Sequence, residues 1–506
     1  MRFLATSCLA LLVASKALAG VPASDCEAHD PSLAKQGCTA ILAAGQDMQS
    51  LAFEAYNNRA LAELALQEPQ EAVQDALAGI ALNPDNGPVH LTLARAYLAL
   101  NQPEKALDAA NQALTLSPNA PGGYVLLGQL QLARGDWRAS VAEQNLALQR
   151  DPGDADAYMA RAMAEVAGGD LKTGLADANK AAALGGMDPR VHLIRGLAAA
   201  AAEDWQVAAA EEAQYLAQDP DNVYALMVHS QAQQMLGDNV SALADINHAI
   251  AVSPDDLELY ERRAELKDVL GSFQDEAADL TTVINGASQN QMTDVLYHNL
   301  LLRAQLYLQL KQPQKAEADM SRAMALQPEH WQAYALRAVA EREAGQLDAA
   351  LADDEKALAL TPGNAQVYTD LSLVHDAQHN YAAAAADEAE VLKTLPHSAP
   401  DLNNRCWFLA LDGKLNEALG YCQQALQITP NDPATLDSTG FVYLQLQNNQ
   451  QAIHYYDQAL KADPKMASSL YGRALAEQRL GRNKQAETDL ALAKQYDPNI
   501  VKDFGT

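Results

Sequence analysis

The sequence has 506 residues, of which 49% are hydrophobic and only 6% aromatic. Its formal net charge of −30 repels phosphate backbones and anionic lipid head groups, which excludes nucleic acid as a class of partner. Alanine and leucine dominate and β-branched residues are few, so helix is favoured along nearly the whole chain.

The first nineteen residues predict a secretory signal peptide. Arg2 supplies a positive start, residues 3–15 form an apolar stretch, and Ala17-Leu18-Ala19 places small residues at the two positions that cleavage requires. We expect cleavage after Ala19, with the protein exported to the periplasm or secreted. The apolar stretch is too short to span a bilayer, and no later stretch of the sequence is long enough, so no membrane-spanning segment is expected.

Cysteine usage agrees with export. The chain has five cysteines, and removal of Cys8 with the signal peptide leaves Cys26, Cys38, Cys406 and Cys422. These four fall into two local pairs, which an oxidising compartment would allow to close as disulfides. Four separate buried thiols are the alternative. No Cys-x-x-Cys spacing occurs, so a metal site made of cysteines is not expected.

Residues 20–52 are predicted to form an N-terminal cap. Asp30-Pro31 is typical of a helix start, and a helix is expected from Pro31 to Ala44. This helix is similar to the second helix of the repeats that follow it. We interpret the segment as half a repeat, held by its own disulfide between Cys26 and Cys38.

The rest of the chain consists of thirteen copies of one 34-residue pattern, marked by prolines that recur on two grids. The first grid consists of Pro84, Pro118, Pro152, Pro220 and Pro254, and the second, shifted by six residues, of Pro328, Pro362, Pro396, Pro430, Pro464 and Pro498. A fixed period of this length predicts stacked units instead of a globule with a single core.

One copy, residues 331–364, shows what each unit contains. Residues 331–344 predict a first helix, Gly345-Gln346 breaks it, and residues 348–360 predict a second helix. Pro362 disfavours helical geometry in the residue before it, so the second helix must end there. Each copy is therefore a helix hairpin followed by a turn.

Small residues occupy the eighth position of every copy. They are Ala60, Ala94, Gly128, Ala162, Gly196, Ser230, Ala264, Ala304, Ala338, Ser372, Cys406, Gly440 and Ala474. A larger side chain would wedge the two helices of a hairpin apart, so this position predicts close helix contact. Cys422 lies sixteen residues after Cys406, which places the second cysteine pair across the eleventh hairpin.

These positions resemble the tetratricopeptide repeat family, whose motif has a bulky fourth residue, small eighth, twentieth and twenty-seventh residues, and proline at the thirty-second. Tyr124, Tyr158, Tyr260, Tyr334 and Tyr368 fit the fourth position, and Ala113, Ala147, Ala249, Ala323, Ala357, Ala425, Ala459 and Ala493 fit the twenty-seventh. The match covers residues 53–500. The resemblance implies an all-α solenoid of about thirteen hairpins in a right-handed superhelix, with the first helices lining an inner groove.

Charged residues repeat as well. Arginine occupies the seventh position in eight copies, and in seven of them an acid follows sixteen residues later. These pairs are Arg59/Asp75, Arg161/Asp177, Arg195/Glu211, Arg263/Asp279, Arg303/Asp319, Arg337/Asp353 and Arg473/Asp489. The two positions lie symmetrically about the turn between the helices, so we expect an ion pair across each hairpin. Exposed surface pairs, worth about 0–1 kcal/mol each, are the alternative.

The seventh copy departs most from the pattern. Glu276 stands where a small residue is expected, and six extra residues lie within 285–296, a polar stretch that predicts a loop. We expect a seam at residues 291–296 between a block of seven copies (53–290) and a block of six (297–500).

The C-terminal end of the array also departs from the pattern. Only the short tail 501–506 follows the last copy, so no polar capping helix is expected there. Leu490, Ala493 and Tyr496 would then be partly exposed and form a candidate edge for self-association.

No catalytic residue, cofactor or metal is expected, since no segment outside the repeats is long enough for a catalytic domain and no phosphate loop or nucleophile motif occurs. His375 and His379 have the spacing of a zinc helix but lack a third ligand, and we interpret them as ordinary polar residues. Glu258, Glu261, Glu265 and Asp268 form an acidic ridge on the first helix of the seventh copy. A solvated face is the expected interpretation, with calcium or a basic peptide as alternatives.

The ninth position of each copy is expected to project into the groove. In the last five copies this position is apolar, and it holds Val339, Leu373, Trp407, Phe441 and Leu475, with Tyr471 nearby and Asn403, Asp437 and Gln478 as a polar rim. Such a stripe predicts an exposed binding groove. Packing of Trp407 and Phe441 between helices is the alternative.

The leading hypothesis is a non-enzymatic, exported scaffold that binds a peptide or a helix of a partner protein in this groove. The second hypothesis is a periplasmic assembly factor for a secreted polysaccharide or envelope complex, in which the aromatic residues would hold sugar.

Overall fold

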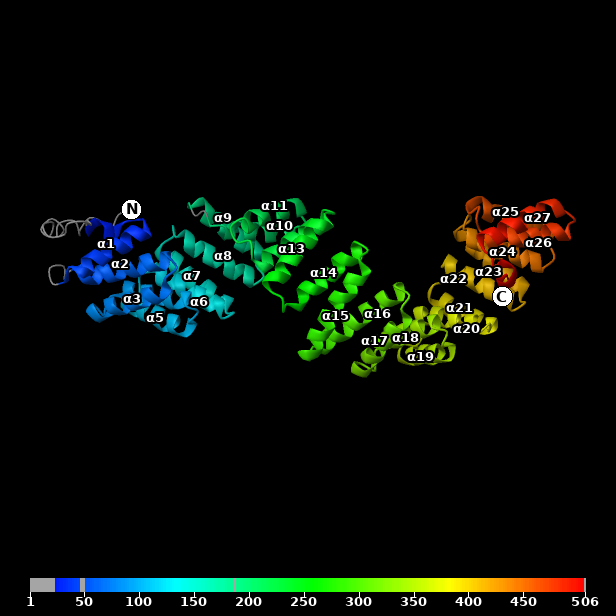
Figure 1. Cartoon of the computed structure of the whole chain (residues 1–506), viewed down its shortest axis with the longest axis horizontal. Coiled ribbons are helices and arrows are strands. Elements are labelled where there is room, and N and C mark those ends of the chain that lie inside the picture. Colours follow the sequence, from blue (N-terminus) through cyan, green and yellow to red (C-terminus); the bar gives the residue numbers. More distant parts are fainter. Residues whose placement is uncertain (1–22, 46–50, 186–187, 505–506) are drawn as a thin grey trace. The chain divides into compact units, whose positions relative to one another are not determined.

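The computed structural model of the chain describes residues 23–45, 51–185 and 188–504. Within these ranges every regular element is helical: one short 3-10 helix, twenty-eight α-helices and no strand. The helices follow one another in antiparallel pairs (Figure 1), which confirms the predicted all-α solenoid of thirteen hairpins. The predicted signal peptide, residues 1–19, lies outside the described residues. No described helix combines the length and the apolar character needed to cross a membrane.

The chain divides into two compact units, residues 1–254 and 255–506. The first unit contains η1 (Ala23–Glu27), α1 (Pro31–Ala43), α2 (Ala52–Ala65), α3 (Pro69–Leu82), α4 (Gly87–Ala99), α5 (Pro103–Leu116), α6 (Pro121–Ala133), α7 (Trp137–Arg150), α8 (Ala155–Ala167), α9 (Leu171–Ala183), α10 (Arg190–Ala201), α11 (Trp205–Leu216), α12 (Val223–Met235) and α13 (Asn239–Val252). These are the N-terminal segment and the first six repeats.

The second unit holds the remaining seven repeats and a short C-terminal helix. It contains α14 (Leu257–Val269), α15 (Phe273–Gln289), α16 (Thr293–Gln309), α17 (Pro313–Leu326), α18 (Trp331–Glu343), α19 (Leu347–Leu360), α20 (Ala365–Ala377), α21 (Tyr381–Thr394), α22 (Ala399–Leu411), α23 (Leu415–Ile428), α24 (Pro433–Gln445), α25 (Asn449–Ala462), α26 (Ala467–Arg479), α27 (Asn483–Tyr496) and α28 (Ile500–Asp503).

The expectation of a loop over residues 285–296 is wrong. The six extra residues lengthen α15 at its C-terminal end and α16 at its N-terminal end, and only residues 290–292 join the two helices. Gln291 takes a left-handed conformation there, with φ of 56°. Residues 285–289 continue the hydrogen-bonded ladder of α15 because Ile284 and Ala287 are buried against α16, which stabilises the extra turn. The predicted seam, residues 291–296, lies inside the second unit.

Local sequence sets the ends of the helices. In the ninth repeat Gly345 has a φ of +79°, which ends α18 in the left-handed conformation that glycine tolerates. Asn364 then caps α20, since its side chain accepts hydrogen bonds from the backbone N–H groups of Gln366 and Val367. This turn chemistry repeats along the chain and produces one hairpin per 34 residues.

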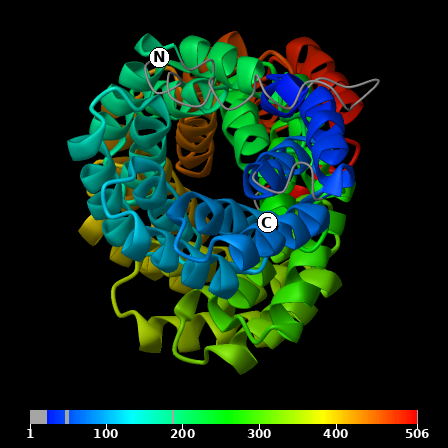
Figure 2. The same cartoon turned by 90° about the vertical axis from the view of Figure 1, so that its left-hand side faces the viewer.

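The first helices of neighbouring repeats lie closer together than the second helices do. Consecutive first helices such as α22, α24 and α26 contact one another directly, and so do α2 and α4 in the first unit. Consecutive second helices show no comparable contact. Figure 2 shows the helices of the first unit, coloured blue to green, following a curved path. In a curved stack the elements that lie closest together are on the inner side, so the first helices line the concave face of each unit, as the resemblance implies.

The small eighth residue allows the two helices of a hairpin to touch, and the residue sixteen positions later fills the space opposite it. Gly128 faces Gln144, Gly196 faces Glu212 and Gly440 faces Tyr456, and a Cβ added at any of these glycines would collide with that side chain. The residue opposite is fully or almost fully buried in each case. The pair of positions eight and twenty-four is therefore one packing unit whose two members must be chosen together.

Three of the residues at the twenty-fourth position are buried acids. Glu212, Asp354 and Glu388 are all fully shielded from solvent. Among residues 23–45, 51–185 and 188–504, neither carboxylate oxygen of Glu212 or of Asp354 has a hydrogen-bond partner. Glu388, in contrast, accepts a hydrogen bond from the Ser372 hydroxyl at 2.8 Å. Burial, reinforced by neighbouring carboxylates, raises the pKa of Glu212 to about 8 and that of Asp354 to about 8.

The predicted ion pairs across the hairpins are confirmed in six of the seven repeats. In each of the six the guanidinium binds both carboxylate oxygens of the aspartate, as Arg303 binds Asp319 at 2.8 and 2.6 Å. The aspartates are buried, so these are not surface pairs. In several repeats the arginine also bonds to the preceding second helix, as Arg337 does to Ser321.

The seventh predicted pair, Arg195 with Glu211, is wrong. Arg195 instead donates hydrogen bonds to the side chain of Asn179. The Glu211 carboxylate is bonded to His192 Nδ1 at 2.6 Å, so His192 takes the place of the arginine. His229 and Asp245, at 2.8 Å, form an equivalent pair in the sixth repeat that has no arginine.

The N-terminal end of the array is covered by a capping helix as expected, and the C-terminal end is covered more fully than expected. At the N-terminal end α1 packs on α2, and Cys26 and Cys38 are both buried beneath it. At the C-terminal end Ile500 of α28 packs against Ala493, and both are buried. The expected exposure of Ala493 is therefore wrong, although Tyr496 does remain 41% exposed.

A double-mutant cycle on Arg337 and Asp353, each changed to Leu, should give a coupling free energy of about 1–3 kcal/mol from urea unfolding. The reason is that each single change leaves a buried charge without its partner. The control is the surface pair Lys393 and Glu390, whose side chains are 67% and 38% exposed respectively. The coupling free energy of this pair should be at most about 1 kcal/mol. Equal coupling in the two cycles would contradict a buried clamp.

The buried acids should make the protein less stable as pH rises. The pKa of Glu212 in the folded protein, about 8, exceeds its ordinary value of 4.5, so the folded state keeps a proton that the unfolded state loses. The free energy of unfolding then falls between about pH 4.5 and pH 8, by up to about 1.4 kcal/mol per pH unit for this group.

Glu212→Gln should flatten this part of the pH profile of the thermal midpoint, because an amide cannot ionise. Gln144 already occupies the equivalent position opposite a glycine in the third repeat, so the substitution has a precedent in the same fold. Glu355→Gln, on an exposed surface, is the matched control. An unchanged profile in Glu212→Gln would show that Glu212 is ionised in the folded state.

Each of the two predicted cysteine pairs is brought together, with Cα atoms 4.5 Å apart for Cys26 and Cys38 and 5.3 Å apart for Cys406 and Cys422. Exported protein, denatured without reductant, should therefore show no free thiol in alkylation followed by mass spectrometry. Replacing Cys406 and Cys422 together by alanine reproduces the Ala60 and Ala76 arrangement of the first repeat. It should lower the free energy of unfolding by about 3 kcal/mol. Four reactive thiols in the exported protein would contradict this prediction.

Candidate functional site

Four of the six predicted groove residues lie on neighbouring first helices near the C-terminal end. Trp407 on α22 contacts Phe441 on α24, with ring centroids 4.9 Å apart. Leu475 and Tyr471 lie on α26, the next first helix. Trp407, Tyr471 and Leu475 are partly exposed, but Phe441 is only 3% exposed.

The C-terminal tail accounts for the burial of Phe441. The chain turns back after α28, and the ring of Phe504 enters between Phe441, at 5.5 Å, and Tyr471, at 4.9 Å, in an edge-to-face arrangement with both. Trp407, Phe441, Tyr471 and Phe504 thus form a chain of ring contacts, hereafter the aromatic cluster. The predicted stripe exists, and a segment of the same polypeptide covers part of it.

The other two predicted residues do not join the aromatic cluster. Val339 on α18 packs with the buried residues of the eighth and ninth repeats, and Leu373 lies on α20. Both are partly exposed. The five apolar ninth positions therefore do not form a single continuous cluster.

The expected polar rim is partly engaged inside the protein. Asp437 on α24 accepts a hydrogen bond from the Ser469 hydroxyl, and burial raises its pKa to about 6. The Oδ1 atom of Asn403 has no hydrogen-bond partner among the described residues. Asp437 is thus largely committed to the packing of α24 against α26.

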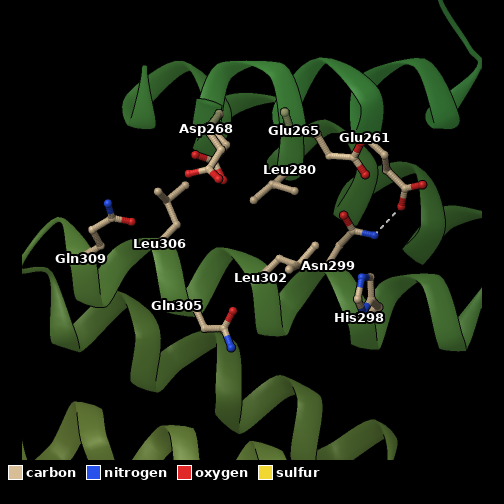
Figure 3. Close-up of a pocket in the computed structure, with 12 residues that line it drawn as sticks. Glu261, Glu265, Asp268, Leu280, His298, Asn299, Leu302, Gln305, Leu306 and Gln309 are labelled. Carbon is tan, nitrogen blue, oxygen red and sulfur yellow. Dashed lines mark hydrogen bonds between the residues drawn. The ribbon is translucent and has the colours of Figure 1, made fainter. Parts of the chain in front are cut away.

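A second site lies where the acidic ridge faces the eighth repeat. A cavity of about 390 Å³ opens between α14, α15 and α16 (Figure 3). Its acidic members are Glu261, Glu265, Asp268 and Glu276. The remaining lining residues are Ala264, Leu280, His298, Asn299, Leu302, Gln305, Leu306 and Gln309. We call this cavity the acidic pocket.

The carboxylates of the acidic pocket have few cationic partners. Arg262 approaches Glu265 at 3.7 Å, and both side chains are exposed. Lys267 points elsewhere and pairs with Asp279 at 2.6 Å. Burial, together with the negative charge of Asp268, raises the pKa of Glu276 to about 7. The pocket is therefore an electronegative cavity in which like charges are crowded.

Asn299 is the most distinctive residue of the acidic pocket. Its side chain is fully buried, and its Nδ2 donates to Glu261 at 2.6 Å and to the Val295 carbonyl. Within the described part of the chain, no donor reaches its Oδ1. Figure 3 shows the carboxamide pointing into the space between α14 and α16.

The two histidines that resemble a zinc helix are engaged separately. His375 bonds to Asp387 at 2.6 Å, while His379 lies in the turn and bonds to the Tyr381 hydroxyl at 2.8 Å. Among the described residues no group of three histidine, cysteine or acidic side chains is arranged to hold a metal ion.

Sequence reasoning missed two of the residues that shape these sites. Phe504 lies in a tail that follows the last repeat, and its signal is that it is the one aromatic residue of the sequence after Tyr496. Asn299 sits at the third position of its repeat, three residues beyond the insertion. Its role depends on the lengthened α15 and α16, which the pattern of 34 residues did not predict.

One family model described as tetratricopeptide repeat matches residues 159–223, 301–365 and 441–499, and a second model with the same description matches residues 88–130. No curated protein matches the sequence.

Several solved structures are similar to the chain. A chain of the APC/C hetero-tetramer Cut9–Hcn1 is 15% identical, with 92% of this chain and 96% of that chain covered and a TM-score of 0.38. Yeast Tom70 is 15% identical, with 82% of this chain and 93% of Tom70 covered and a TM-score of 0.37. Pseudomonas aeruginosa pilF is 19% identical, with 42% of this chain and 96% of pilF covered and a TM-score of 0.36.

Tetratricopeptide repeat proteins are generally non-enzymatic, and their fold supports protein–protein interaction. The matched segments fall on the hairpins described above, with proline at the turn and small residues between the helices. The chain belongs to the tetratricopeptide repeat family.

Proposed function

We propose that the protein is an exported, non-enzymatic scaffold that binds a peptide or helix of a partner protein on the concave face of its last repeats, at the aromatic cluster. One observation carries this proposal: the ring of Phe504, from a segment outside the repeats, lies between Phe441 and Tyr471. A surface that accepts an aromatic ring from the chain's own tail has the shape and chemistry to accept one from a partner.

The tail is held weakly enough to be displaced. Aromatic pairs contribute about 0.5–1.5 kcal/mol each beyond the burial of area, and Phe504 makes two. The helix that precedes it, α28, spans only Ile500–Asp503 and cannot be stable without its packing. A partner segment with more contacts would therefore replace Phe504 without unfolding the repeats.

Two features support export. The sequence of residues 1–19 has the three regions of a signal peptide. The four remaining cysteines form two close pairs, which is the usage expected of a protein in an oxidising compartment. A retained periplasmic protein and a secreted one are both compatible with these features.

The alternative function, assembly of a secreted polysaccharide or envelope complex, needs a sugar site with free polar groups beside the rings. Asp437, expected to provide one, is bonded to Ser469. The ring faces are also occupied in part by Phe504. The peptide hypothesis therefore agrees better with the contacts, and a glycan array run beside the peptide assay tests the alternative.

Phe504→Ala in the full chain should open the site to a fluorescent peptide with the sequence of residues 497–506, supplied in trans. We expect binding to the variant by fluorescence anisotropy and at least about tenfold weaker binding to the wild type, because the tethered tail competes at high effective concentration. The same peptide with Phe504 replaced by alanine should not bind.

Tyr471→Ala added to Phe504→Ala should remove the binding, since the Tyr471 ring contacts the ring of Phe504, with centroids 4.9 Å apart, and is only partly buried itself. Phe441→Ala is less informative, because Phe441 is buried and its loss creates a cavity. Tyr496→Ala, which removes an exposed aromatic residue outside the cluster, is the matched control. Peptide binding that is equal in the wild type and all variants would contradict the proposed site.

A further inference from the structure

The acidic pocket of α14, α15 and α16 plays no part in the site at the aromatic cluster, although both lie in the second unit. Glu261, Glu265 and Asp268 lie on one face of α14, on the first helix of a repeat, which is the concave side. α14 and α16 lack the close contact that joins α16 to α18 and α18 to α20. The opening between them is large enough to admit a side chain.

The lower part of the acidic pocket is apolar. Leu280 and Leu306 are almost completely buried, and Leu302 remains 38% exposed although it lies among acids and amides. A ligand that fits must therefore combine an apolar stem with a positive head. Lysine and arginine side chains have this construction, with a chain of methylene groups that packs on apolar surface and a charged end that reaches polar groups.

Asn299 supplies an observation that is independent of the acidic charge. Its buried Oδ1 atom accepts no hydrogen bond from any residue that the structure describes, whereas its Nδ2 atom is already bonded to Glu261. A buried carbonyl oxygen without a donor is destabilising, and a ligand that carries N–H groups would satisfy it. The ligand that the pocket lacks is thus a hydrogen-bond donor as well as a cation.

We propose that the acidic pocket binds the side chain of a lysine or arginine in a partner polypeptide, with the head group between Glu265, Asp268 and Asn299 and the stem against Leu280, Leu302 and Leu306. This inference rests on the proposed function as an interaction scaffold and names the chemistry of a second contact with the partner. The positive charge would also relieve the repulsion between Asp268 and Glu276.

A polypeptide fits better than a small amine because the acidic surface continues beyond the pocket. A second cavity of about 560 Å³ shares Glu261 and Glu265 with it and is also lined by Asp255, Asp256 and Glu258. Asn290, Met292 and Val295, from the link and the lengthened start of α16, form its other wall. The six extra residues of the seventh repeat thus help to shape an extended acidic trough, which suits a chain with several basic residues.

The test uses the full chain and a fluorescein-labelled peptide, Gly-Ser-Ala-Lys-Ala-Ser-Ala-Lys-Ala-Ser-Gly, with companions that carry arginine or N-acetyl-lysine at both lysine positions. At about 0.05 M salt, where charges on the surface are weakly screened, the lysine and arginine peptides should bind by fluorescence anisotropy. The N-acetyl-lysine peptide should bind at least about tenfold more weakly, because acetylation removes the charge. Equal binding of all three peptides would overturn the proposal.

Glu265→Gln combined with Asp268→Asn should weaken binding of the lysine peptide about tenfold. Both positions are exposed, so the substitutions preserve folding. Glu355→Gln with Glu487→Gln removes the same charge at exposed positions elsewhere and should leave the affinity unchanged within about twofold. Asn299→Leu should also weaken binding of the lysine peptide, even though this substitution leaves the charge of the acidic pocket unchanged. An equal loss in the charge-matched control would show a diffuse attraction and overturn the site.

Calcium alone, titrated in the same assay, separates a metal site from the proposed one. Displacement of the lysine peptide by micromolar calcium, lost in the Glu265→Gln/Asp268→Asn variant, would overturn the proposal in favour of a metal. The peptide of residues 497–506 is measured on the Phe504→Ala chain in parallel. If that peptide binds and the lysine peptide does not, this inference fails while the proposed function stands.

Discussion

The close approach of two helices at a small eighth residue is the constraint on which the rest of the structure depends. Where that residue is glycine, the opposite position holds a larger side chain such as Gln144 or Tyr456, and where it is alanine the opposite side chain still fits against a methyl group. This packing brings the seventh and twenty-third positions within bonding distance, so the Arg–Asp clamp is possible only because the eighth residue is small. The same geometry explains Cys406 and Cys422, which occupy positions eight and twenty-four and approach as the alanine pairs do. A single steric requirement thus places core packing, an ion pair and a close cysteine pair at equivalent points of the hairpin.

The clamp also joins neighbouring hairpins. Arg303 reaches Thr281 of the preceding second helix, and Arg473 reaches Asp457, through the nitrogen that is not engaged by their own aspartate. Each repeat in a solenoid contacts only its neighbours, so stability depends on such interfaces. The buried acid Asp354 lies in the same hairpin as the Arg337–Asp353 clamp and opposes this stabilisation when it ionises, which makes that hairpin sensitive to pH.

The two candidate sites arise where the regular repeat is interrupted. The acidic pocket forms where six extra residues lengthen α15 and α16, and α14 and α16 then lie further apart than other neighbouring first helices such as α16 and α18. The aromatic cluster forms where the array ends and the tail folds back on the concave face of the last repeats. Regular repeats bury their apolar residues against the next repeat. Surface that is not buried by the next repeat therefore becomes available where that continuity changes, and the chemistry of the two places differs: one is lined by carboxylates and the other by aromatic rings.

The sequence by itself determined the helix hairpins, their number and the six Arg–Asp clamps, because these depend on contacts within 34 residues that recur thirteen times. It also placed Trp407, Phe441 and Leu475 on the same face, since the ninth position keeps a fixed direction on each first helix, and Tyr471 lies one helical turn before Leu475. Tertiary structure alone decided what covers that face, because the return of Phe504 depends on the packing of α28 against Ala493 and Leu470. It alone decided that residues 285–289 extend a helix, because burial of Ile284 and Ala287 against α16 outweighs the loop preference of a polar segment. Periodicity describes contacts that every repeat makes, and it is silent on contacts that only one repeat makes.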